Sequence, residues 1–147
     1  MRDRAALAPP ALARTWQQVF PGTPDQLRPA RAALRAFLDG CPATDDVALL
    51  VTELAANAIA HSASGRPGGT FTVRFGHVHG RHVRAEVQDA GSDWHGDIHR
   101  SASHPHGLYL LLALAAACGS DGTGRSRTVW FGLDERDGQL PAELDRP

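Results

Sequence analysis

The chain has 147 residues, a length typical of one domain, and 42% of them are hydrophobic, which is enough for a core without disulfides. The formal net charge of −1 argues against a nucleic-acid-binding or membrane-surface protein. All 15 basic residues are arginine, so no lysine can act as a nucleophile. Any group that binds phosphate must therefore be Arg, His or a backbone N–H.

The cysteines and the apolar runs indicate the cellular compartment of the protein. Cys41 and Cys118 are too few for a disulfide framework, and we expect both to be reduced. The longest apolar run, Leu108–Cys118, is too short for a membrane span, and the N-terminus lacks the apolar core of a signal peptide. We therefore expect a cytoplasmic protein. Its one domain would cover residues 15–133, between a flexible segment, 1–14, and a polar tail, 134–147.

Hydrophobic periodicity predicts the first elements of this domain. A short strand is expected over Trp16–Phe20, followed by a helix over residues 25–39 that Gly40 ends. Thr44 is a suitable N-cap for a second helix, which should extend to about Ser62.

Alternating apolar residues then predict a hairpin of two strands, over 70–75 and 83–87. Residues 90–106 lack periodicity, which is typical of a functional loop. The remaining predicted elements are an apolar helix, a turn region and a last strand, over 107–118, 119–125 and 128–133. This order favours an α+β two-layer sandwich, with helices on one face of a mainly antiparallel sheet.

The second helix carries a polar stripe. At about 100° per residue, four polar residues fall within roughly 80° of one another: Asp46, Glu53, Asn57 and His61. An adjacent apolar stripe is expected to face the core: Val47, Val51, Leu54 and Ala58. Leu50 interrupts the polar stripe. Glu and Asn one turn apart could hold Mg²⁺ and a polarised hydroxyl together, and the alternative is an ordinary solvated helix face.

Three further segments are weak signals separately. Asp89 ends a strand just before a turn with Gly91, where a carboxylate can accept a hydrogen bond from the amino group of a base. In Ser103–Leu108, Gly107 begins the apolar helix, whose free N–H groups suit a phosphate. Gly122–Phe131 is a small-residue turn leading into an amphipathic strand. Each also fits a plain structural role, as a strand exit, a helix start and a hairpin arm.

In their order and spacing, the four segments resemble the ATP site of the histidine-kinase-like ATPase (GHKL) superfamily. The short length and the Thr-Val-Trp-Phe ending resemble its anti-sigma-factor serine kinases. The resemblance covers roughly residues 15–133. It implies a Bergerat-type fold that binds ATP and Mg²⁺ between helices and sheet, under a mobile lid over residues 92–106.

The resemblance also implies roles for individual residues. Asn57 would coordinate Mg²⁺, and Glu53 would accept the proton of the attacking hydroxyl. Asp89 would bind the adenine amino group, with Gly91 lining the base pocket. The remaining nucleotide contacts would come from His106, Gly107 and Leu108 at the phosphates and from Thr128 behind the adenine.

The implied function is a serine/threonine kinase that binds a sigma factor and phosphorylates a Ser on an antagonist (anti-anti-sigma) protein. The alternative is a non-catalytic ATP-sensing module that sequesters a transcription regulator. Glu53 and Asn57 favour the kinase. Asp93 and Pro105 replace glycines of the family pattern and favour the module, because one adds negative charge near the phosphates and the other lacks an N–H. We expect no direct contact with nucleic acid or membrane. The sequence does not determine the partner proteins or the oligomeric state, and a homodimer is one alternative.

Overall fold

The computed structural model describes residues 13–78, 80–91, 113–123 and 125–134. Within these ranges the longer elements are β1 (Ala13–Pro21), α1 (Leu27–Phe37), α2 (Thr44–His61), β2 (Thr70–Val78), β3 (His82–Asp89), β4 (Ala117–Thr123) and β5 (Ser126–Asp134). Two short 3-10 helices, Pro24–Gln26 and Ala63–Gly65, precede α1 and follow α2.

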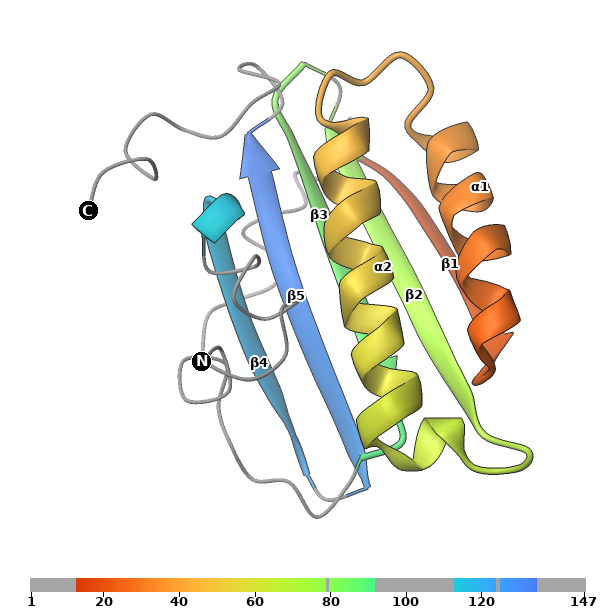
Figure 1. The fold of residues 1–147 in the computed structure, drawn as a ribbon. Coiled ribbons are helices and arrows are strands. Elements are labelled where there is room, and N and C mark those ends of the chain that lie inside the picture. Colours follow the sequence, from red (N-terminus) through yellow and green to blue (C-terminus); the bar gives the residue numbers. More distant parts are fainter. Residues whose placement is uncertain (1–12, 79, 92–112, 124, 135–147) are drawn as a thin grey trace.

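The five strands form one sheet in the order β1-β2-β3-β5-β4, and every neighbouring pair is antiparallel. Both α1 and α2 lie on the same face of this sheet, with α2 crossing over its centre (Figure 1). The predicted fold class is therefore confirmed: the molecule is a two-layer sandwich with helices on one face.

The core lies between the helices and the facing side of the sheet. All four residues of the predicted apolar stripe are buried: Val47, Val51, Leu54 and Ala58. Aromatic rings fix α1 above β1 and β2, since Phe75 stacks on Phe37 with ring centroids 5.9 Å apart and on Trp16 with centroids 5.1 Å apart. The periodicity that predicted α2 and the hairpin is thus also the pattern that builds the core.

The strand β4 was not predicted. The apolar helix expected over residues 107–118 does not reach its predicted end, because Ala117 begins β4 and Cys118 pairs with Phe131 of β5. The turn region expected over 119–125 is mostly strand. Gly119 is there for packing: a Cβ at this position would lie 2.8 Å from the indole nitrogen of Trp130.

The start of α2 also differs from its prediction. The N-cap position is Ala43, and Thr44 is the first helical residue. The Thr44 hydroxyl donates to the carbonyl oxygens of Leu38 and Cys41, at 3.0 and 2.7 Å. Both carbonyl oxygens also accept a backbone N–H, from Cys41 and Thr44 respectively, so the hydroxyl reinforces the turn that joins the two helices.

Two glycines test how tightly this fold is packed. A Cβ on Gly22 would lie 1.7 Å from the carbonyl oxygen of Ser64, whereas one on Gly76 would meet nothing within 4 Å. We predict that Gly22→Ala lowers the free energy of unfolding by roughly 1–3 kcal/mol through overpacking. The matched control, Gly76→Ala, should raise it by roughly 0.5–1 kcal/mol because alanine suits a strand interior better. Urea denaturation of both variants checks this, and equal midpoints would contradict it.

Candidate functional site

A buried junction fixes the end of α2 against the end of β3. Ser64 has no exposed surface, and its hydroxyl oxygen accepts a hydrogen bond from the Ala90 N–H at 2.9 Å. The Ala63 N–H donates to the Gly91 carbonyl oxygen, also at 2.9 Å. The segment that follows β3 is therefore held beside the last turn of α2.

Local turns shape both sides of this junction. The Ser62 hydroxyl donates to the Ala58 carbonyl at 2.6 Å and accepts from the Ser64 N–H at 3.0 Å, which completes the end of α2. On the other side, the Gly91 N–H donates to Oδ1 of Asp89 at 2.7 Å. Gly91 has a φ of 80°, a conformation that glycine adopts without strain. The predicted turn after Asp89 is thus present.

Asp89 faces the helices, together with an arginine that the sequence analysis missed. Val87 and Val129 belong to the core, and by strand alternation Asp89 and its cross-strand partner Arg127 lie on the same face. Burial raises the pKa of the Asp89 carboxyl above its ordinary 3.8, while the Gly91 N–H and the Arg127 charge act in the opposite direction. Burial likewise lowers the pKa of Arg127, against the influence of Asp89.

The polar stripe of α2 lies beside this region. α1 packs against one flank of α2 (Figure 1), and the helical repeat places the buried Ala48 and Ala55 on that flank. Glu53 and Asn57 lie on the opposite flank, above the part of the sheet that β5 forms, and both are half-buried. His61, at the end of the stripe, is exposed.

Asn57 is more than a solvated residue of a helix surface. Its amide nitrogen is buried and has no hydrogen-bond partner among the described residues. Buried polar groups without partners are rare in proteins and call for an explanation such as a ligand. An amide also carries an oxygen, and a half-turn of the side chain exchanges the two atoms. Asn57 can therefore offer an N–H to an anion or an oxygen to a hard cation such as Mg²⁺.

The structure brings together some predicted site residues and not others. Asp89 and Gly91 lie at the Ser64 junction, whereas Glu53 and Asn57 lie earlier along α2, which ends at His61. Thr128 pairs with Gln88, so its side chain points to the opposite face, away from Asp89. The other predicted site residues, His106, Gly107 and Leu108, lie outside the described residues, as do the predicted lid and its Asp93 and Pro105.

Comparison with known proteins places most of the chain in one family. A family model described as "Histidine kinase-like ATPase domain" matches residues 20–132. This range includes α2, the Ser64 junction and Asp89. A search of curated proteins finds no match to the chain. Among the described residues, no helix is long and apolar enough to cross a membrane.

The raised pKa of Asp89 predicts how substitutions affect stability. Because the folded state disfavours the charged carboxylate, the contribution of Asp89 to stability falls as pH rises from 3.8 through its folded pKa. Asp89→Asn removes the charge and keeps an oxygen for the Gly91 N–H, so it should unfold at an equal or higher temperature than the unaltered protein at pH 7. Asp89→Ala removes that acceptor and should lose about 1 kcal/mol. Thermal unfolding at pH 3.5 and 7 tests this, and a clear loss for Asp89→Asn at pH 7 would count against it.

Proposed function

This chain belongs to the histidine kinase-like ATPase family, and we propose that it binds ATP with Mg²⁺ between α2 and the end of β3. The family supports an ATP-binding regulatory function. The observation that carries the placement is the arrangement around Ser64. Asn57, whose amide nitrogen is buried and has no hydrogen-bond partner among the described residues, belongs to α2, and the half-buried Asp89 belongs to β3. The residues that follow these two elements are hydrogen-bonded to each other.

We propose that Asp89 binds the adenine base of ATP. A half-buried carboxylate that already accepts one backbone N–H still has acceptor positions for an exocyclic amino group. Gly91 lets the backbone pass close to the base because it has no side chain. Arg127 lies across from Asp89 on the same face, so it would also adjoin the base, and its charge lowers the pKa of Asp89 against the larger effect of burial, which raises it.

We propose that the polar stripe of α2 binds the triphosphate of ATP. Asn57 fits a Mg²⁺ site because its amide nitrogen is buried and has no partner within the described part of the chain, and because the amide also carries an oxygen. When bound, Mg²⁺ would neutralise the phosphate oxygens. Glu53, one turn earlier on the same flank, would accept the proton of an attacking hydroxyl. The two side chains thus divide binding and proton transfer between them.

More specifically, we propose that the protein is a serine/threonine kinase that binds a sigma factor and phosphorylates a Ser on an antagonist protein. The support is the presence of both Glu53 and Asn57 on the flank of α2 that α1 leaves uncovered. A non-catalytic ATP-sensing module that sequesters a transcription regulator is the second candidate, favoured by Asp93 and Pro105 in the sequence. Phosphate transfer to an antagonist protein separates the two.

Nucleotide binding is the first test of the site. ATP with Mg²⁺ should raise the melting temperature, since a ligand that binds only the folded state stabilises it. Asp89→Asn should abolish most of this shift, because an amide replaces the carboxylate acceptor of the base and presents an N–H in its place. Calorimetric titration of both proteins measures the effect. If the variant binds ATP as tightly as the unaltered protein, Asp89 does not contact the base.

Glu53 and Asn57 should separate binding from chemistry. Asn57→Ala should weaken Mg-ATP binding and abolish transfer. Glu53→Gln should keep nucleotide bound, because it keeps the size of the side chain, while transfer falls by roughly 10²–10⁴-fold. The control is His61→Ala, an exposed change on the same stripe that should alter neither property.

The assay needs labelled ATP and a candidate antagonist protein with an acceptor Ser. Binding of ATP and of a sigma factor without any transfer by the unaltered protein would reject the kinase and support the sequestering module. Loss of ATP binding in Glu53→Gln would show that Glu53 is needed for binding itself.

A further inference from the structure

The end of β3 and the beginning of β5 bring two oppositely charged side chains together at the proposed nucleotide site. Asp89 and Arg127 are direct cross-strand partners, and both lie on the helix side of the sheet. Residues directly opposite each other on antiparallel strands have their Cβ atoms roughly 4.5–5.5 Å apart. Each of the two groups also alters the pKa of the other, so their charges interact. The carboxylate and the guanidinium therefore act as one unit, the Asp89–Arg127 pair.

Hydrogen bonds on both faces of the sheet fix the backbone of this pair. On the helix face, the Gly91 N–H donates to the Asp89 carboxylate at 2.7 Å. On the opposite face, the Gln88 amide donates to the Ser126 hydroxyl at 2.8 Å, which links the residues that precede Asp89 and Arg127. Both side chains of the pair are half-buried. The two residues are thus held at a set position relative to each other.

The strand beyond Arg127 contributes no side chain at this level of the sheet. Gly122 of β4 is the cross-strand partner of Arg127 on its other side. A Cβ on Gly122 would lie 2.2 Å from the carbonyl oxygen of Ser126, and the φ of Gly122 is 143°, so the position requires glycine. Asp89 is therefore the cross-strand neighbour that brings a side chain to Arg127.

An acceptor beside a set of donors matches one edge of adenine. The exocyclic amino group of adenine donates hydrogen bonds, and the nearest ring nitrogen on either side of it accepts them. The Asp89 carboxylate can accept from the amino group. A guanidinium has five N–H donors in one plane, so Arg127 can serve the carboxylate and a flat base at the same time.

We propose that Arg127 is a base-reading residue, which donates a hydrogen bond to the adenine ring nitrogen beside the amino group that Asp89 binds. This inference rests on the proposed nucleotide site and adds a second residue that recognises the base. Phosphate binding is the other role that an arginine offers a nucleotide. The strand register favours the base, because it places Arg127 beside Asp89, whereas Asn57 and Glu53 of the triphosphate site lie on α2.

Binding of ATP and of two analogues to the full-length chain tests this role. In 1-deaza-ATP and 7-deaza-ATP, C–H replaces one or the other of these ring nitrogens, while the amino group and the triphosphate are kept. With Mg²⁺, one analogue should bind the unaltered protein about tenfold more weakly than ATP, because a hydrogen bond from a charged donor is lost. Arg127→Met should bind ATP about tenfold more weakly and should no longer distinguish ATP from that analogue.

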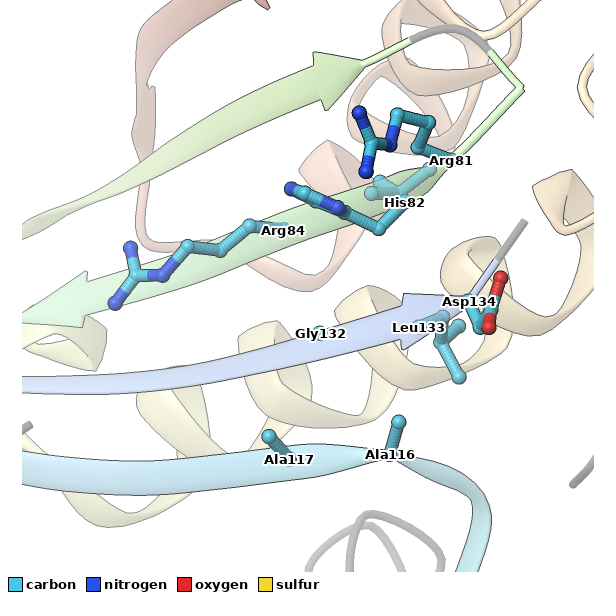
Figure 2. Close-up of a pocket in the computed structure, with 9 residues that line it drawn as sticks. Arg81, His82, Arg84, Ala116, Ala117, Gly132, Leu133 and Asp134 are labelled. Carbon is cyan, nitrogen blue, oxygen red and sulfur yellow. The ribbon is translucent and has the colours of Figure 1, made fainter. Parts of the chain in front are cut away.

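The matched control is Arg81→Met, which makes the same change of charge at an exposed arginine. Arg81 lines a separate pocket of about 340 Å³ at the other end of β3 (Figure 2), so this variant should bind all three nucleotides like the unaltered protein. Thermal unfolding establishes that each variant is folded. If Arg127→Met does not fold, Arg127→Gln, which is shorter and uncharged, takes its place with the same expected result.

The outcomes separate the role of Arg127 from the nucleotide site itself. Equal affinity of the unaltered protein for ATP and both analogues overturns the proposal. Equal weakening of all three nucleotides by Arg127→Met also overturns it, because the arginine then acts on the phosphates or on the charge of Asp89. If ATP binds and Asp89→Asn weakens it while Arg127→Met does not, only the role of Arg127 is rejected. If ATP does not bind at all, the nucleotide site is rejected as well.

Discussion

The fold depends on backbone packed against backbone around one serine. A Cβ on Gly69 would lie 2.2 Å from the Ser64 carbonyl oxygen, and Gly22 is closer still. The Gly22 N–H also donates to the Gly69 carbonyl oxygen at 2.8 Å. The end of β1, the end of α2 and the start of β2 therefore meet at Ser64 without intervening side chains. The hydroxyl of the same residue carries the hydrogen bond to Ala90, so the position of Asp89 relative to Asn57 is set by this contact.

Periodicity made the main elements predictable. Apolar residues with a helical repeat indicated α2 and its buried stripe, and alternation indicated the β2–β3 hairpin, because in both cases the core selects the pattern. The same logic does not reveal Ser64. Its burial results from three segments that meet in space, and in the sequence it is one small polar residue in a turn.

The predicted secondary structure is wrong where tertiary contacts outweigh the local conformational preference of the sequence. The segment Ala117–Thr123 reads Ala-Cys-Gly-Ser-Asp-Gly-Thr and has one β-branched residue, at its end, yet pairing with β5 makes it β4. In the sequence Gly119 suggests a turn. In the structure its lack of a side chain leaves room for the ring of Trp130. Arg127 could have been found from the sequence, because it alternates with Val129 and Phe131 and so must face the helices. Thr128, one residue along, must for the same reason face away.

The two faces of β3 carry different groups. Hydrogen bonds on the face away from the helices support Asp89 on the helix face. Asp89 belongs to the helix side, and the residue before it, Gln88, belongs to the other. Oε1 of Gln88 accepts a hydrogen bond from Arg74 of β2 at 2.7 Å, and its Nε2 donates to the Ser126 hydroxyl of β5 at 2.8 Å. The end of β3 is thus tied to both neighbouring strands on one face while Ser64 ties the following residue on the other. A carboxylate that must meet a ligand in one orientation needs such support, because rigid elements place functional groups more accurately than free loops do.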